Sequence, residues 1–327
     1  MPIYNGEAFL REAIDSSLTQ SFGEFEFLII DDGCTDASSA IIGSYTDPRI
    51  RLIHNGKRLG LVKSLNKGLD LARGEYVARM DCDDISLPQR LARQVAFMDR
   101  HSQIGLCGTW VETIGELAGD LWRYPSDPEI IRCQLLFESV IAHPSVMMRR
   151  TLFGKARLSY SSLYPHAEDY DLWVRSAKSF ALSNIASVLL LRRVHSQQVG
   201  VREREEQRAA AARIRVAQIE DLGIKPTSVE LDLHQSISLW EVQATKEFVM
   251  QAHAWLQKLK AANRKISLYP EPAFSQVLGE RWFAVCNAAS GFGPWTWEIF
   301  WRSPLRAGAA LSWKKRFKLL LKTRFAA

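Results

Sequence analysis

The sequence lacks the features of a membrane-spanning or disulfide-bonded protein. No apolar run reaches the roughly 18 residues that a transmembrane helix needs, and no charged segment followed by an apolar one opens the chain as in a secretory signal. The five cysteines are odd in number and show no C-x-x-C spacing, which excludes a disulfide framework and a zinc ribbon. We therefore expect a cytoplasmic protein.

Two nucleotide-binding signatures are also missing. Neither G-x-G-x-x-G nor G-x-x-x-x-G-K-[ST] occurs, which disfavours a dinucleotide-dependent enzyme and a P-loop nucleotidyltransferase. Acidic residues are absent after Glu298, where eight bases exceed the net charge of +6 of the whole chain. The body is therefore close to neutral and carries no basic patch in sequence, so no nucleic-acid partner is expected.

Apolar periodicity predicts alternating strands and helices over the first two thirds of the chain. This βαβα order indicates an α/β fold with a mixed, mostly parallel sheet covered by helices. After residue 200 the pattern is helical, so we predict a catalytic domain over 1–198 and a helical region over 199–327. The predicted strands are 25–30, 50–54, 76–80, 104–114, 145–148 and 181–193, and the predicted helices are 7–20, 37–45, 61–72, 88–98, 128–137 and 168–178.

Three carboxylates in four residues, Asp81-Cys82-Asp83-Asp84, directly follow the strand predicted over 76–80. Carboxylates this close repel one another unless a cation lies between them, and Mg²⁺ and Mn²⁺ prefer oxygen ligands. Asp31-Asp32 follows another predicted strand, and the carboxyl ends of parallel strands share one sheet edge. The cluster is thus either a cation site or a solvated acidic turn in which Asp84 or Ser86 caps the next helix.

Four segments, in this order, resemble the serial motifs of the family 2 glycosyltransferases with the GT-A fold. The resemblance covers about residues 1–198, and four ordered motifs are far more specific than any one of them. It implies a Rossmann-like nucleotide-diphospho-sugar transferase fold. The segments are Pro2-Ile3-Tyr4-Asn5-Gly6, Leu28-Ile29-Ile30-Asp31-Asp32-Gly33-Cys34-Thr35-Asp36, Gly74-Glu75-Tyr76-Val77-Ala78-Arg79-Met80-Asp81-Cys82-Asp83-Asp84 and His166-Ala167-Glu168-Asp169-Tyr170-Asp171-Leu172-Trp173.

The resemblance implies two ends of a donor site. Pro2, Tyr4, Asn5 and Asp32 match residues that bind the nucleotide part of the donor. Asp81-Cys82-Asp83 matches the family's D-x-D motif, in which Asp81 would lie against the ribose and Asp83 would ligate Mn²⁺ or Mg²⁺. Such an ion stabilises the negative charge that a diphosphate leaving group gains as the glycosidic bond breaks.

The resemblance also implies a catalytic base. Glu168-Asp169 matches the acidic pair that serves inverting transfer, and we choose Asp169 as the base that takes the proton of an acceptor hydroxyl. The alternative is acid enrichment in the first turn of a helix, which the helix dipole favours. His195 matches a histidine that follows the last strand of the catalytic domain, and it is either a further metal ligand or a hydrogen-bonded surface group.

One departure from the family lies at the first residues. The family opens with a strand of apolar residues before the Pro-x-Tyr-Asn turn, and here the sequence begins at Met1-Pro2. We expect either a true start upstream or a sheet whose neighbouring strands carry unpaired backbone groups.

The segment 295–324 combines aromatic and aliphatic residues with bases at helical spacing. This pattern suits a helix lying on an anionic membrane surface, here the inner face of the cytoplasmic membrane, or else a helix packed on the core with a solvated basic face. The predicted partners are a nucleotide-diphospho-sugar donor and a saccharide or lipid-linked saccharide acceptor in cell-surface glycan synthesis. A truncated or non-catalytic sugar-nucleotide-binding protein is the alternative function.

Overall fold

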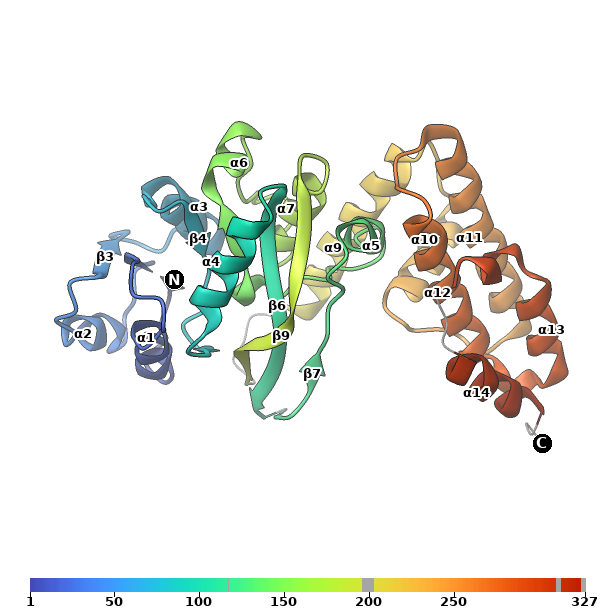
Figure 1. Cartoon of the computed structure of the whole chain (residues 1–327), viewed down its shortest axis with the longest axis horizontal. Helices are drawn as coiled ribbons and strands as arrows, with labels where there is room; N and C mark the ends of the chain where they lie inside the picture. Colours follow the sequence, from blue (N-terminus) through green and yellow to red (C-terminus); the bar gives the residue numbers. More distant parts are fainter. Residues whose placement is uncertain (117, 196–202, 310–312, 325–327) are drawn as a thin grey trace. The chain divides into compact units, whose positions relative to one another are not determined.

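The computed structural model describes residues 1–116, 118–195, 203–309 and 313–324 (Figure 1). The chain forms two compact units. The first contains Met1–Pro128 and Ser139–Ala210, and the second contains Glu129–Glu138 and Ala211–Ala327. The first unit holds all the strands and every candidate site residue.

A small parallel sheet opens the first unit, with the strand order β1-β2-β3. The run Phe-Leu-Ile-Ile forms β2, whose side chains are mostly buried, and Asp31 ends this strand. The elements of this part are β1 (Pro2–Ile3), α1 (Leu10–Leu18), β2 (Phe27–Asp31), α2 (Ser38–Gly43), β3 (Ile50–His54) and α3 (Leu61–Leu71). All five predicted elements of this stretch are confirmed, with ends shifted by a few residues.

A second sheet has the order β4-β8-β6-β9-β5, with β7 paired to β6. The long strands β6 and β9 run parallel and side by side in Figure 1, and the other pairs are antiparallel. The two-residue strands β5 and β7 are too short for a sequence pattern to predict. The elements here are β4 (Tyr76–Ala78), β5 (Ile85–Ser86), α4 (Arg90–Arg100), β6 (Ile104–Gly115), β7 (Leu121–Trp122), α5 (Pro128–Gln134), β8 (Met147–Arg149), α6 (Arg150–Lys155), α7 (Glu168–Ser176) and β9 (Ala181–Val194).

The first residues join the parallel sheet. Pro2 and Ile3, which the resemblance assigns to a turn, pair with Ile30 and Asp31 as the short strand β1. The amino group of Met1 donates to the Leu28 carbonyl at 2.8 Å, and the Ile30 amide donates to the Met1 carbonyl at 2.9 Å. This ladder covers only the carboxyl half of β2.

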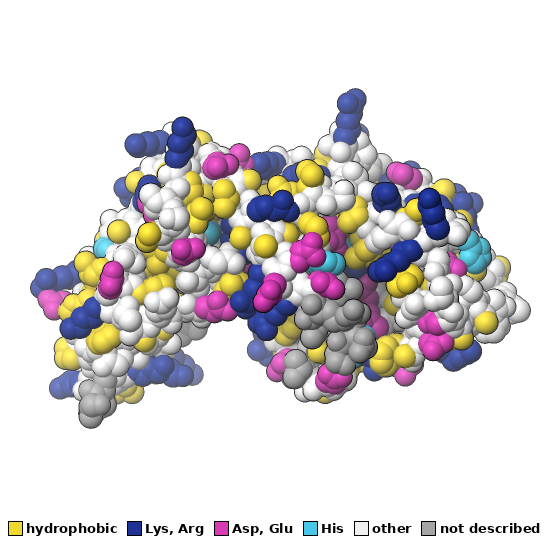
Figure 2. All heavy atoms as spheres, turned by 180° about the vertical axis from the view of Figure 1, so that it is seen from behind, with side chains coloured by type: hydrophobic (Ala, Val, Ile, Leu, Met, Phe, Trp, Pro, Cys, Tyr) yellow, Lys and Arg dark blue, Asp and Glu magenta, His cyan; other side chains and the backbone are white. Residues whose placement is uncertain are grey.

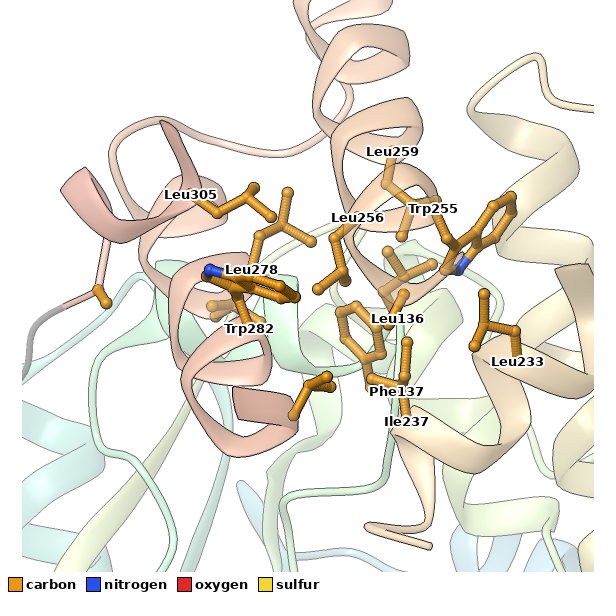
Figure 3. Packing of buried hydrophobic residues seen from close by; sticks show 14 of the residues in the cluster. Leu136, Phe137, Leu233, Ile237, Trp255, Leu256, Leu259, Leu278, Trp282 and Leu305 are labelled. Carbon is orange, nitrogen blue, oxygen red and sulfur yellow. The ribbon is translucent and has the colours of Figure 1, made fainter. Parts of the chain in front are cut away.

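The second unit is helical, as predicted, and has its own apolar core. Figure 3 shows Phe137, Trp255 and Trp282 packed among leucines and isoleucines of this core, and each ring is at most 2% exposed. A capping box at Thr227 and Glu230 starts one of these helices. The helices are α9 (Arg204–Asp221), α10 (Ser228–Ser238), α11 (Lys246–Ile266), α12 (Ala273–Ala288), α13 (Pro294–Arg302) and α14 (Trp313–Arg324).

The basic tail ends in α14. Leu319 and Thr323 are buried, and Leu319 belongs to the core of the second unit, while Phe317 and Leu321 remain exposed. Part of the predicted surface segment, residues 310–312, lies outside the described residues. None of the described helices has both the length and the apolar character to cross a bilayer. On the face drawn in Figure 2, basic side chains lie among acidic and hydrophobic ones.

Candidate active site

The acidic cluster after β4 is compact and partly buried. One carboxylate oxygen from each of Asp81, Asp83 and Asp84 lies within 4.8 Å of the others. Asp84 is 1% exposed, its Oδ1 accepts from the Arg193 amide at 2.8 Å, and its buried Oδ2 has no hydrogen-bond partner. Burial, followed by the charges of Asp81 and Asp83, raises the pKa of Asp84 well above its ordinary value.

This geometry corrects the reading of the cluster as a solvated acidic turn. Asp84 is buried rather than solvated, and α4 begins only at Arg90 with Gln89 as its N-cap, so neither Asp84 nor Ser86 caps that helix. A buried carboxylate oxygen without a partner is costly unless a positive group reaches it. The donor set of carboxylate oxygens therefore fits a hard divalent cation such as Mn²⁺ or Mg²⁺.

Arg79 balances part of this negative charge from inside the protein. Its Nη1 donates to Asp81 Oδ2 at 2.6 Å, its Nη2 lies 2.5 Å from Asp81 Oδ1, and its side chain is 6% exposed. The sequence favours a solvated surface position for Arg79. That prediction is wrong, because the side chain is buried. Burial raises the pKa of Asp81, and the Arg79 guanidinium opposes that rise.

His195, which lies far from Asp83 in the sequence, contacts the acidic cluster. Its Nε2 lies 3.2 Å from Asp83 Oδ2, and its ring stacks at a tilt against Phe9 with 5.2 Å between centroids. The strand β9 places His195 here, and the neighbouring Arg193 donates to the Asp83 carbonyl at 2.9 Å. The imidazole thus lies against the acidic cluster, where either a metal ligand or a hydrogen-bonded group is possible.

Glu168 and Asp169 begin α7, where three acids occupy the first turn. Burial, and next the charge of Glu168, raises the pKa of Asp169 to about 7, and burial likewise raises the pKa of Glu168. The charge of Arg79 lowers both values, and the charge of Asp81 raises that of Glu168. The positive charge of Arg79 therefore acts on the acid pair of α7 as well as on Asp81.

The contact between His143 and the buried Tyr160 was not predicted from the sequence. His143 Nε2 lies 2.9 Å from the Tyr160 hydroxyl, and Tyr160 is 3% exposed. Burial raises the pKa of Tyr160, and burial lowers the pKa of His143 well below its ordinary value. Only the fold joins these residues, because Tyr160 lies in an irregular segment. Trp173, expected in the core, is fully buried.

The residues expected at the nucleotide end lie around the turn after β2. The Asn5 side chain accepts from the Thr35 amide at 2.9 Å, and the Arg58 guanidinium lies 4.1 Å from the centroid of the Tyr4 ring, which is 40% exposed. A Cβ at Gly6 would lie 3.0 Å from Cys82 Sγ, so this loop also touches the D-x-D segment.

Both aspartates at the end of β2 are satisfied by protein groups. Asp32 accepts from the Asn55 side chain and from the Leu59 and Gly60 amides, each at 2.8 Å. Although burial raises the pKa of Asp31, hydrogen bonds led by the Cys34 amide and thiol lower it to about 2. The Gly6 amide also donates to the Ser38 hydroxyl at 2.9 Å, so the same loop contacts the start of α2.

Relatives of known name and structure resemble this chain. Residues 1–156 match the family model described as Glycosyl transferase family 2. An uncharacterized glycosyltransferase of Haemophilus influenzae is 30% identical over 73% of this chain and 77% of its own length. The O-antigen biosynthesis glycosyltransferase WbnJ of Escherichia coli is 30% identical over 60% of this chain and 79% of its own length.

Solved structures share the fold at low sequence identity. S. aureus TarS 1-349, in complex with UDP-GlcNAc, is 18% identical over 98% of this chain and 89% of its own, with a TM-score of 0.57. The mannosyltransferase PcManGT from Pyrobaculum calidifontis, in complex with GDP-Man and Mn²⁺, is 15% identical over 97% of this chain and 85% of its own, with a TM-score of 0.53. The GT-A fold predicted from the motifs is confirmed, and the chain belongs to the family 2 glycosyltransferases.

Proposed function

We propose that this glycosyltransferase is metal-dependent and inverting, and that it moves a sugar from a nucleotide-diphospho-sugar to a hydroxyl group of a cell-surface glycan or its lipid-linked precursor. The observation that carries the proposal is the acidic cluster of Asp81, Asp83 and Asp84, together with Asp169, whose raised pKa is opposed by the charge of the same arginine that binds Asp81. A sugar bound between them would have a proton acceptor at one end and a leaving-group site at the other.

Asp169 has the properties that a general base requires. A carboxylate with a pKa near the working pH accepts a proton more readily than an ordinary aspartate and is still ionised in a useful fraction of molecules. As the acceptor oxygen forms its bond to the anomeric carbon, its proton passes to Asp169 and the bond to the diphosphate breaks. Glu168 keeps the pKa of Asp169 high by its nearby charge.

Asp83 and His195 would hold the cation, and Asp81 would lie against the ribose. A bound Mn²⁺ or Mg²⁺ would supply positive charge to the departing diphosphate oxygens. Arg79 holds the carboxylate of Asp81 through a hydrogen bond and an ion-pair contact, which leaves Asp81 preorganised before the donor arrives. The complex of PcManGT with GDP-Man and Mn²⁺ supports the cofactor assignment.

The nucleotide part of the donor would lie against the loop of Pro2, Tyr4 and Asn5 and beside Asp32. The half-exposed ring of Tyr4 offers a stacking surface for a base, and its rear face is backed by Arg58. The UDP-GlcNAc complex of TarS and the O-antigen role of WbnJ support the donor and the surface-glycan acceptor.

A lipid-linked acceptor would make membrane contact useful, and α14 has a suitable surface. Phe317 and Leu321 are 50% and 40% exposed on a helix that also presents exposed lysines. We expect the double variant Phe317→Ser/Leu321→Ser to sediment less with vesicles containing anionic lipid than the unaltered chain. Leu163→Ser, at an exposed leucine of the first unit, is the matched control, and equal sedimentation of all three proteins would contradict membrane contact.

The proposal is tested by measuring nucleoside diphosphate release and sugar transfer from a panel of UDP- and GDP-sugars, with Mn²⁺ and with EDTA. We expect release from at least one donor only with the metal, and loss of that release in Asp83→Asn. Asp70→Asn, at an exposed aspartate of α3, should retain it. Equal activity in EDTA and in Mn²⁺, or equal activity of Asp83→Asn and the unaltered chain, would contradict metal dependence. Absence of turnover with every donor, together with no donor-induced thermal shift, would favour the non-catalytic alternative.

A further inference from the structure

Arg193, near the end of β9, binds two neighbouring aspartates of the acidic cluster. Its amide donates to Asp84 Oδ1 at 2.8 Å, and its side-chain Nε donates to the Asp83 carbonyl at 2.9 Å. The Arg193 side chain is 14% exposed, so these bonds lie mostly away from water. One residue of β9 thus holds both the backbone of Asp83 and the carboxylate of Asp84.

The end of the β5 ladder explains why a side chain is needed at this point. β5 and β9 pair in an antiparallel register that joins Ile85 to Leu191, and continuing this register would place Asp83 opposite Arg193. β5 begins only at Ile85, so Asp83 lies before the paired strand. The amide and the Nε of Arg193 make contacts there instead, and the position of the Asp83 backbone therefore depends in part on this arginine.

The first turn of α1 holds the guanidinium of Arg193. Nη2 donates to Glu12 Oε2 at 2.6 Å, and the guanidinium lies 4.4 Å from the centroid of the Phe9 ring. Phe9 is the N-cap of α1 and Glu12 follows three residues later, a spacing that places both side chains on one side of the helix. The charge of Arg193 is therefore paired with a carboxylate outside the acidic cluster.

The Phe9 ring also contacts the candidate metal ligand His195. The centroids of the two rings lie 5.2 Å apart with 44° between their planes, and His195 Nε2 lies 3.2 Å from Asp83 Oδ2. Phe9 thus contacts both Arg193 and His195. Packing against a neighbouring ring restricts the orientation of an imidazole, as the hydrogen bonds around metal ligands do.

We propose that Arg193 and Phe9 are positioning residues of the cation site, Arg193 for the backbone of Asp83 and Phe9 for the imidazole of His195. The inference rests on the proposed function, in which Asp83 and His195 hold the cation. Arg193 serves by its geometry and against its charge, because a positive group near the site repels a cation. Replacing groups that orient metal ligands weakens metal binding by about tenfold to a hundredfold.

The test measures the Mn²⁺ affinity of the full chain by electron paramagnetic resonance of the free ion. We expect Arg193→Gln to weaken Mn²⁺ binding about tenfold, because the Nε donor to the Asp83 carbonyl is lost. Removal of a positive charge alone would tighten binding, so the sign of the change separates positioning from electrostatics. Arg193→Lys keeps the charge but not the planar fork of donors, and it should weaken binding as well.

Arg49→Gln is the matched control. The Arg49 guanidinium lies 4.7 Å from the centroid of the Phe25 ring, its Nη2 donates to the Leu18 carbonyl at 3.0 Å, and it pairs with Asp47 at 2.8 Å. This variant loses the same kinds of contact, but none of them is to the acidic cluster. It should lower Tm in EDTA and change Mn²⁺ affinity less than about threefold.

Phe9 is tested with a double-mutant cycle. Phe9→Leu should weaken Mn²⁺ binding about tenfold in the unaltered chain but less than about threefold in the background of His195→Ala, because the ring acts on the cation through that imidazole. Phe25→Leu is the control and should leave Mn²⁺ affinity unchanged in both backgrounds. Tm in EDTA shows whether each variant is folded, and the Phe9 cycle still tests the inference if Arg193→Gln is not.

The inference and the proposed function fail in distinguishable ways. Unchanged or tighter Mn²⁺ binding by Arg193→Gln would overturn the role of Arg193, as would equal weakening by Arg193→Gln and Arg49→Gln. The same factor for Phe9→Leu with and without the His195 imidazole would overturn the role of Phe9. If the unaltered chain itself binds no Mn²⁺, the proposed cation site is wrong, and the inference is wrong with it.

Discussion

The two acidic segments that follow β2 and β4 look alike in sequence and differ in how the protein treats them. Asp31 accepts hydrogen bonds from two amides, the Ser39 hydroxyl and His54, and these bonds hold its pKa at about 2. Asp84 is equally buried, has one oxygen without a partner, and its pKa is raised by burial and by neighbouring acids.

The difference separates a structural carboxylate from one that fits a ligand. Where backbone amides converge on a carboxylate, the protein itself satisfies the charge and the turn is stabilised. Where acids face one another and one buried oxygen of Asp84 has no hydrogen-bond partner, the remaining negative charge favours a cation from outside. Adjacent aspartates in a sequence motif therefore do not identify a metal site; the hydrogen bonds around them do.

The largest expected effect concerns Asp169, the proposed base. Asp169→Asn should lower the turnover number about a thousandfold, because the amide cannot accept the acceptor's proton. Steady-state transfer assays with the best donor measure it. Asp171→Asn, in the same helical turn, is the control: its carboxylate binds Arg175 at 2.6 Å, so it should lower Tm and change turnover less than tenfold. Equal losses in both variants would remove Asp169 from the role of base.

Metal affinity should separate the two acidic segments directly. Asp83→Asn is expected to weaken Mn²⁺ binding about a hundredfold in calorimetric titration, because the amide carries no charge and ligates hard cations poorly. Asp31→Asn should leave Mn²⁺ affinity unchanged. If the two variants bind Mn²⁺ alike, the contrast between the segments does not concern metal.

Stability should respond in the opposite order. Asp31→Asn replaces a carboxylate that accepts four hydrogen bonds, and we expect it to lower the free energy of unfolding by about 2 kcal/mol. Urea denaturation of the full chain measures this value. Asp83→Asn relieves repulsion among acids and should cost less than Asp31→Asn; a larger loss for Asp83→Asn would reverse the comparison.

The smallest expected effect is on the pH dependence of stability, to which Asp31 and Asp169 should contribute with opposite signs. The pKa of Asp31 is lowered from 3.8 to about 2, so its contribution is present above pH 4 and is lost as pH falls toward 2. The pKa of Asp169 is raised from 3.8 to about 7, so the native state binds the extra proton and stability falls as pH rises from about 4 to 7.

Denaturation at pH 5 and pH 8 in EDTA should show the second effect. The unaltered chain should lose stability relative to Asp169→Asn between these values, because the asparagine cannot ionise. In the assay, turnover should rise with pH through about 7 as Asp169 ionises. If the difference in stability between the unaltered chain and Asp169→Asn is the same at pH 5 and pH 8, folding does not raise the pKa of Asp169.

Much of the first unit could be predicted from sequence. Apolar runs and helical spacing located β2, β3, α3, β6, α7 and β9 with ends wrong by a few residues. The order of four motifs predicted the GT-A fold, and that fold is confirmed. The two-residue strands were missed because a run so short has no periodicity to detect.

Only part of the candidate site could be predicted from the sequence. The sequence named Asp81, Asp83 and His195 individually, but the 3.2 Å contact between His195 and Asp83 joins residues more than a hundred positions apart. No local pattern reports such a distance. The reading of Arg79 failed for the same reason, because an arginine between two polar motifs looks solvated unless the surrounding packing is known.

The sequence by itself determined which chemical groups are available and in what order along the chain, since residue type and spacing are local properties. Tertiary structure decided which carboxylates the protein satisfies with hydrogen bonds and which buried oxygen, on Asp84, it leaves without a partner. It also decided that His143 meets Tyr160 and that residues of β2 and β4 line one apolar cavity. Burial and hydrogen-bond geometry arise from contacts between distant segments, and those contacts convert similar aspartates into a structural turn and a candidate metal site.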